Sequence, residues 1–296
     1  MMTFDEIQLM ARTIVSKQIE LSAEKQLKNM YSYKKNNLRG KNGCVICIGE
    51  TADGPLKIDM GKMGVNAFFG GTTGSGKTIL LLTMMLGLLE NYGSKELELL
   101  IHYGKDGSTY QTFRNLNNVQ LLPQKSDLAE AIKRLKAEQE RRDALFATFD
   151  GCYDIEDYNA LSMEKLDYKL LIIDEFSHLV GHVDSIGTKT KPGLLLELTS
   201  KCRSAGIFVI IATQRKSDNL ISTDVTENFG IRVALRCKEQ GSSKTIINSH
   251  DACSILDSQK GRGYYQGDDL VPFQSYYISG AQLKQRVLEI ERSQGE

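Results

Sequence analysis

A glycine-rich octapeptide carries the most specific chemistry in this sequence. It runs Gly71, Thr72, Thr73, Gly74, Ser75, Gly76, Lys77 and Thr78, a complete G-x-x-x-x-G-K-[ST] pattern. Its glycines let the backbone curl so that successive N–H groups point at phosphate oxygens, and the following helix offers its positive N-terminal end to the same anion. The Lys77 ammonium can reach the β and γ phosphates, and the Thr78 hydroxyl can bind Mg²⁺. The octapeptide therefore predicts a site for ATP with Mg²⁺.

Two adjacent carboxylates mark a second place where chemistry is expected. Residues 170–173, Leu-Leu-Ile-Ile, form an apolar run that ends in Asp174 and Glu175. A strand of this kind brings its first carboxylate to the edge of the sheet beside the phosphate loop, where it can hold the hydrated Mg²⁺. The next carboxylate is then placed to orient and deprotonate an attacking water. We therefore predict Asp174 as a metal-binding residue and Glu175 as the catalytic base, rather than a merely solvated strand end.

A polar residue follows another apolar run, at residues 207–211. The chain continues Ala-Thr-Gln, so Gln214 stands at the end of a buried strand. A polar side chain in that place, beside the phosphate site, can sense whether the γ-phosphate is present. We predict this catalytic sensor role for Gln214, with a purely structural amide as the alternative.

Two further pairs have the spacing of metal ligands but lack the rest of a site. His178 and His182 are four residues apart, and no third ligand is placed convincingly. Cys44 and Cys47 form one C-x-x-C inside an apolar run, with no second pair and no neighbouring histidine. Surface or packing roles are favoured for the histidines, and buried small hydrophobic residues for the cysteines.

The overall composition is that of a globular protein. The 296 residues include 37 basic and 37 acidic ones, and 41% of the chain is apolar, which excludes a disordered or collagen-like chain. The zero balance gives no electrostatic argument for nucleic acid or membrane. The longest strongly apolar stretch, residues 79–89, is shorter than the roughly 18 residues that a spanning helix needs. With no signal peptide visible, we expect a soluble, cytoplasmic protein without a membrane span.

The pattern of elements predicts two units. Thr3 and Glu6 form a capping box for an N-terminal helix, and a polar, partly basic linker follows, so residues 1–40 are predicted as a helical arm and linker. Strands and helices alternate over residues 41–296, which predicts a three-layer α/β domain with a mainly parallel sheet. The predicted strands are residues 44–48, 66–69, 97–101, 170–173, 207–211 and 231–235. The predicted helices are residues 77–90, one capped by Ser126 that reaches Phe149, and one capped by Ser279 and Gln282.

Several motifs in the same order resemble the FtsK/SpoIIIE DNA-translocase ATPases of the FtsK–HerA group. They are the phosphate loop, I-I-D-E-F at residues 172–176, S-K-C-R-S-A-G-I at 200–207, A-T-Q-R at 212–215, E-R-R at 140–142, S-K-T-I-I at 243–247 and G-R-G at 261–263. The resemblance covers roughly residues 44–278. The family's membrane-spanning N-terminal region and its winged-helix module are therefore not expected here.

The resemblance implies a RecA-like P-loop NTPase fold and an FtsK-like ATPase motor domain over residues 41–296. Such motors are usually hexameric rings of identical subunits that pull double-stranded DNA through a central channel. In the family, the arginine of the segment that Arg203 matches reaches across the subunit interface to the neighbour's γ-phosphate. The alternative for Arg203 is a cap on its own helix.

The main functional hypothesis is an ATP-hydrolysing ring motor on double-stranded DNA. It would be a coupling- or packaging-type protein from a mobile element or phage, with membrane or DNA-processing proteins as further partners. A second hypothesis is a secretion-type ATPase that moves protein substrates. A third is an ATP-binding scaffold with little hydrolysis, against which the intact Glu175 argues.

Overall fold

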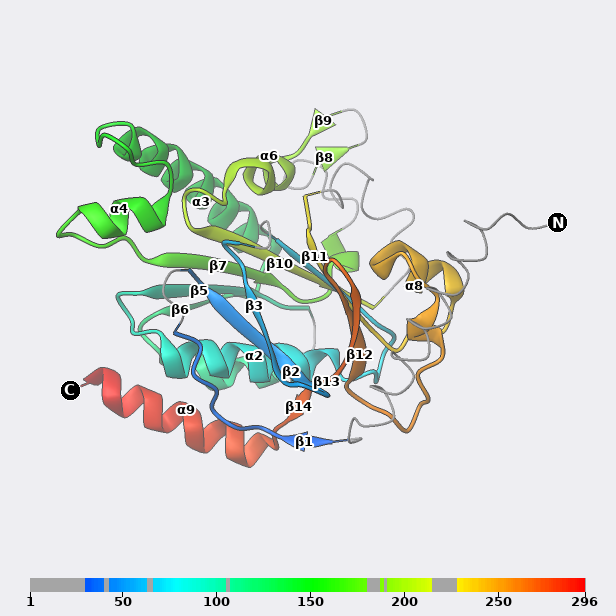
Figure 1. Ribbon diagram of the computed structural model, residues 1–296. Coiled ribbons are helices and arrows are strands. Elements are labelled where there is room, and N and C mark those ends of the chain that lie inside the picture. The colour runs from blue at the N-terminus through cyan, green and yellow to red at the C-terminus, as the bar shows by residue number, and fades with distance from the viewer. Residues whose placement is uncertain are drawn as a thin grey trace.

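The computed structural model describes residues 30–39, 43–62, 66–104, 107–179, 187–188, 191–214 and 228–295 (Figure 1). The helix predicted from Thr3 lies outside these residues. Within them, no helix combines the length and the apolar character that crossing a bilayer requires.

One large sheet organises the described part of the chain. Its strand order is β3-β2-β13-β12-β11-β4-β10-β7-β5-β6. The strands are β2 (Val45–Thr51), β3 (Gly54–Asp59), β4 (Ala67–Gly70), β5 (Leu97–His102), β6 (Val119–Leu122), β7 (Tyr168–Ile173), β10 (Ile207–Thr213), β11 (Ile231–Leu235), β12 (Arg262–Gln266) and β13 (Leu270–Gln274). The strands from β11 to β6 pair in parallel, while β12, β13, β2 and β3 extend the sheet with antiparallel pairs. The predicted α/β fold with a mainly parallel sheet is confirmed.

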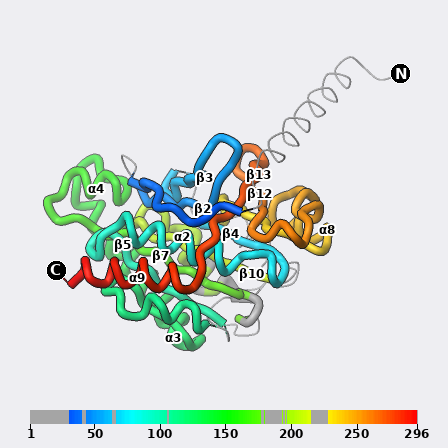
Figure 2. The backbone as a smooth tube through the Cα atoms, turned by 90° about the horizontal axis from the view of Figure 1, so that it is seen from below, coloured from blue at the N-terminus to red at the C-terminus, as the bar shows by residue number. Residues whose placement is uncertain are grey.

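Helices cover both faces of this sheet (Figures 1 and 2). They are α2 (Lys77–Asn91), α3 (Lys125–Phe146), α4 (Ile155–Leu161), α6 (Leu194–Lys201), α8 (Gln240–Ile247) and α9 (Gly280–Gly295), with 3₁₀ turns η1 (Gly107–Phe113), η2 (Phe176–Leu179) and η3 (Asp251–Cys253). In β7, Leu170 and Ile172 join the core on the side of α2 and α9, whereas Leu171 and Ile173 join the core under α3, α6 and α8. Burial on both faces explains why the parallel strands are continuous apolar runs.

Of the three helix starts predicted from capping residues, two lie in the described part of the chain, and one of these is wrong. Helix α3 begins at Lys125, and its N-cap is Gln124, whose N–H donates to Asp127 Oδ2 over 2.9 Å. Ser126 therefore lies inside the helix, which ends before Phe149. Helix α9 has the predicted capping box, because the backbone N–H of Ser279 donates to Gln282 Oε1 over 3.1 Å.

The stretch from Met30 to Arg39 lies along the α/β domain. Its short strand β1 (Tyr31–Ser32) pairs in parallel with β14 (Tyr276–Tyr277), and Leu38 is buried. Arg39 forms a bidentate ion pair with Glu96, with N–O distances of 2.8 and 2.7 Å. β1 and β14 form a separate two-stranded sheet, and the last residues of the predicted linker contact the α/β domain.

Candidate nucleotide-binding site

The phosphate loop connects the central strand β4 to helix α2. Gly76 is the N-cap of α2 and has a φ of +104°, and a Cβ there would lie 2.9 Å from the backbone nitrogen of Gly261. Only glycine fits this backbone conformation and this close approach. Ser75 Oγ is a buried side-chain oxygen to which the described residues give no hydrogen-bond partner. A polar cradle at a helix N-terminus with an unpartnered hydroxyl fits a phosphate group.

Lys77 and Asp174 lie together at the carboxyl edge of the sheet. The strands that precede them in the chain, β4 before the phosphate loop and β7 before Asp174, are not adjacent in the sheet. Strand β10 lies between β4 and β7. Lys77 Nζ donates to Asp174 Oδ1 over 2.7 Å, and both side chains are largely buried. The prediction that the acidic strand end lies beside the phosphate loop therefore agrees with this geometry. Thr78, the second predicted metal-binding residue, is half-buried in the first turn of α2.

Asp174 has a second partner that the sequence analysis did not identify. The Tyr110 hydroxyl, from the η1 turn after β5, donates to Asp174 Oδ2 over 2.7 Å. Burial raises the pKa of Tyr110 well above its usual value, and the neighbouring Asp174 carboxylate adds to the effect. The phenol therefore stays protonated and acts as a donor at neutral pH.

Glu175 occupies a strained backbone position directly after Asp174. Its φ is +69°, a left-handed value that non-glycine residues seldom adopt, and its side chain is buried. Such conformations cost roughly 1–3 kcal/mol and cluster at functional sites. The position agrees with the predicted role as catalytic base, which stays a prediction.

Gln214 lies against the phosphate loop. It directly follows β10, and its Oε1 accepts a hydrogen bond of 2.6 Å from the Thr73 hydroxyl. The amide is exposed, and its role as a γ-phosphate sensor stays a prediction. Of the predicted site residues, the loop, Asp174, Glu175 and Gln214 thus share one edge of the sheet.

Arg203 lies at the opposite edge. It precedes the first residue of β10, while the phosphate loop follows Gly70, which is paired with Thr213 at the other end of that strand. Seven residues of strand separate the two edges, about 20 Å at about 3.3 Å per residue. The exposed guanidinium donates from Nε to the Gly61 carbonyl over 2.9 Å and not to its own helix. The side-chain contact of Arg203 in this structure is therefore with Gly61 and is not a cap on its own helix.

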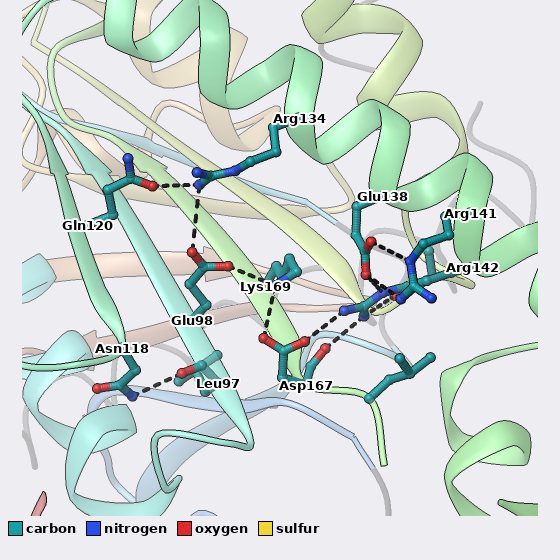
Figure 3. A network of polar contacts seen from close by, with 12 residues as sticks. Leu97, Glu98, Asn118, Gln120, Arg134, Glu138, Arg141, Arg142, Asp167 and Lys169 are labelled. Carbon is teal, nitrogen blue, oxygen red and sulfur yellow. Dashed lines mark hydrogen bonds and ion pairs between the residues drawn. The ribbon is translucent and has the colours of Figure 1, made fainter. Parts of the chain in front are cut away.

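A polar network around Arg142 and Asp167 joins helix α3 to the start of β7 (Figure 3). Arg142, from the E-R-R motif, is fully buried and donates from Nη1 to the carbonyls of Asp167 and Ala205 over 2.7 and 2.8 Å. Its other nitrogens pair with the carboxylates of Glu138 and Asp167. Arg142 thus joins α3, the start of β7 and the Arg203 turn.

The weaker metal candidates gain no support. His182 and the side chain of His178 lie outside the described residues. Cys44 and Cys47 are buried and unpaired with each other, and burial raises the pKa of Cys44 to about 12. Across the described ranges, no group of three or more His, Cys, Asp or Glu side chains could hold a metal ion.

Gly261 is a second residue whose part in the site was not predicted. Its N–H donates to the Ser75 carbonyl of the phosphate loop over 2.8 Å, and its φ is +79°. A Cβ there would lie 2.4 Å from Ser275 Oγ. The sequence presents Gly261 only as part of a G-R-G motif, and no spacing rule connects that motif to a loop almost 190 residues earlier.

Substituting Gly261 by alanine should therefore weaken nucleotide binding. Strain at positive φ should cost about 1–3 kcal/mol of unfolding free energy, and the shifted backbone would disturb its bond to Ser75. Gly151→Ala is the matched control, because Gly151 has a φ of +74° with nothing within 4 Å of a Cβ. Both variants should melt earlier, but only Gly261→Ala should lose affinity in a titration with a fluorescent ATP analogue. Equal affinities would contradict the supporting role of Gly261.

The fold and this site define a P-loop ATPase, and the comparisons give its family. The model of the FtsK/SpoIIIE family matches residues 26–186, more than half of the chain. The chain therefore belongs to the FtsK/SpoIIIE family, as the motifs indicated.

Relatives of two kinds are similar in sequence. The DNA translocase SftA of Bacillus subtilis is 31% identical over 209 residues, which are 68% of this chain and 21% of SftA. The ESX secretion system protein EccC of Geobacillus thermodenitrificans is 30% identical over 271 residues, 86% of this chain and 17% of EccC. The chain thus spans about a fifth of the length of these relatives.

Solved structures agree on the fold. The conjugation coupling protein TcpA of pCW3, in its monomer form with ATPγS, superposes with a TM-score of 0.73 at 21% identity, covering 89% of this chain and 75% of that one. ATPases 2 and 3 of EssC from Geobacillus thermodenitrificans superpose with a TM-score of 0.75 at 19% identity, covering 91% and 52%.

Proposed function

We propose that this chain is an ATP-hydrolysing motor that translocates double-stranded DNA as a hexameric ring of identical subunits. The observation that carries the ATPase part is the contact between Lys77 and Asp174, which joins the phosphate loop to the acidic strand end. The DNA cargo is supported by relatives named DNA translocases and by the coupling protein TcpA. Membrane or DNA-processing proteins are the further partners proposed for DNA transfer.

The site residues have distinct roles in ATP hydrolysis. The loop N–H groups and Lys77 bind the phosphates of ATP, and Thr78 and Asp174 would hold Mg²⁺. When bound, Mg²⁺ neutralises charge on the β and γ phosphates. Glu175 takes the proton of the attacking water, and Gln214 reports on the γ-phosphate through its contact with Thr73. The TcpA structure with ATPγS supports ATP as the nucleotide.

Ring assembly is supported by the position of Arg203. The residue lies at the sheet edge away from its own phosphate loop and is exposed. A guanidinium there is too far from its own phosphate loop to contact the nucleotide bound in it, and in a ring its charge would stabilise the transferring phosphoryl group of a neighbour's nucleotide.

A second candidate keeps the ATPase and changes the cargo. Relatives named ESX secretion system proteins support a motor for protein substrates. The two candidates share the site and differ in what accelerates ATP turnover.

The test is the rate of ATP hydrolysis over a series of protein concentrations, with and without double-stranded DNA. The DNA-motor proposal expects a rate per subunit that rises with concentration and rises further with DNA, while Lys77→Ala stays inactive throughout. Single-stranded DNA of equal length is the control for charge. Stimulation by unfolded peptide but not by DNA would favour the protein-moving alternative, and ATP binding without turnover would favour a scaffold.

A further inference from the structure

The carboxylate of Asp174 is held at both oxygens, by two residues of different kinds. Lys77 Nζ donates to Oδ1 and the Tyr110 hydroxyl donates to Oδ2, each over 2.7 Å. Tyr110 is 2% exposed and comes from η1, which follows β5, the neighbour of β7 on the side away from β10. The acidic strand end is thus flanked by the phosphate loop on one side and by η1 on the other.

The two contacts differ in how firmly each donor is fixed. Lys77 belongs to the phosphate loop, where its ammonium is expected to turn to the nucleotide. Tyr110 has no such freedom, because its ring stacks on Tyr103 with centroids 5.6 Å apart and planes 17° apart. The Tyr103 hydroxyl in turn accepts a hydrogen bond of 2.6 Å from Gln111 Nε2. We therefore expect the contact with Tyr110 to persist when the contact with Lys77 is exchanged for a ligand.

We propose that Tyr110 is a positioning residue for the metal site: its hydroxyl holds Oδ2 of Asp174 so that Oδ1, which contacts Lys77 in this structure, is presented to the Mg²⁺ that accompanies ATP. A ligating carboxylate depends on such outer hydrogen bonds for its orientation, and their loss typically lowers metal affinity 10–100-fold. This role rests on the proposed function, since it assumes that the loop binds ATP with Mg²⁺. It assigns to Tyr110 a part that no motif of the sequence indicates.

Two matched variants separate positioning from packing. Tyr110→Phe removes the hydroxyl that contacts Asp174 and keeps the stacked ring. Tyr103→Phe removes a hydroxyl from the other ring of the same stack, which bonds to Gln111 and not to Asp174. Both changes are small, and thermal unfolding should show both proteins folded.

The measurement is the affinity for a fluorescent ATP analogue, first in EDTA and then at increasing Mg²⁺. Tyr110→Phe should bind the analogue in EDTA within about twofold of wild type, but its half-saturating Mg²⁺ should rise about tenfold, the low end of the range for such contacts. The affinity for Mn²⁺ in the presence of nucleotide, measured by electron paramagnetic resonance, should fall in parallel. Excess Mg²⁺ should restore ATP turnover, and Tyr103→Phe should match wild type in every measurement.

Three outcomes would overturn the positioning role. They are an unchanged Mg²⁺ midpoint in Tyr110→Phe, equal shifts in both tyrosine variants, and a wild type whose nucleotide binding does not respond to Mg²⁺. Because these measurements need no hydrolysis, they stand apart from the motor proposal. If wild-type protein binds ATP with Mg²⁺ but DNA does not stimulate its turnover, the motor proposal is refuted. The Mg²⁺ titrations would still test the positioning role of Tyr110.

Discussion

Glu175→Gln protein should bind ATP as tightly as wild type and hydrolyse it about 10²–10⁴-fold more slowly, the usual contribution of a general base. Glutamine has the size of glutamate and can occupy the same buried position at a φ of +69°. Its amide, however, cannot accept the proton of the attacking water. The measurement is a single-turnover experiment with the retained nucleotide analysed as ATP or ADP.

Lys77→Ala is the contrasting variant, because it should lose productive nucleotide binding itself. The ammonium contacts phosphate in the ground state, and without it the Asp174 carboxylate loses the cation that lies 2.7 Å away. Filter binding with labelled ATP separates the two variants directly. Wild-type turnover in Glu175→Gln would refute its assignment as the base.

Arg203→Ala should lower ATP turnover by on the order of 10³-fold, as expected for an arginine acting on a neighbour's phosphate, while ATP binding and folding stay nearly intact. The guanidinium is presented on a fixed turn, since Ile155 N–H bonds to the Ser204 carbonyl over 2.8 Å and Arg142 holds the Ala205 carbonyl. Mixing the variant with Lys77→Ala protein should restore some turnover, because each subunit then supplies the part that the other lacks.

Lys201→Ala is the control for this experiment, since it removes an exposed positive charge two residues away. It should hydrolyse ATP normally. If Arg203→Ala melts earlier yet turns over ATP at the wild-type rate, at concentrations where subunits assemble, its contact with Gly61 is structural and the trans role is refuted.

The parts of this molecule that could be predicted from sequence are those whose signal is local. Residues 231–235 coincide with β11, and the buried runs of β7 and β10 are each extended by two residues in the structure. The phosphate loop and the acidic pair are short contiguous motifs, so their contact could be expected once both were placed at one sheet edge.

The parts that could not be predicted depend on contacts between distant segments. Strands β12 and β13 carry polar residues and Pro272, and they are strands because each pairs with a neighbour in the sheet. The start of α3 was misplaced because glutamine at position 124 caps less commonly than serine. Tyr110 and Gly261 belong to no motif with a known link to the site, and only the fold brings them to Asp174 and Ser75.

The dependence of the phosphate loop on Gly261 has a consequence for how the protein is made. Strand β2 pairs with β13, and the Tyr276 hydroxyl bonds to Glu50, 226 residues earlier in the sequence. Contacts between residues so far apart in sequence form late and make folding slow. During synthesis on the ribosome, the chain grows from its N-terminus. The octapeptide precedes its backbone partners by well over a hundred residues, since the Thr72 N–H donates to the Arg236 carbonyl and the Gly261 N–H donates to the Ser75 carbonyl. We therefore expect ATP to stabilise the nascent chain only after Arg236 and Gly261 have been synthesised.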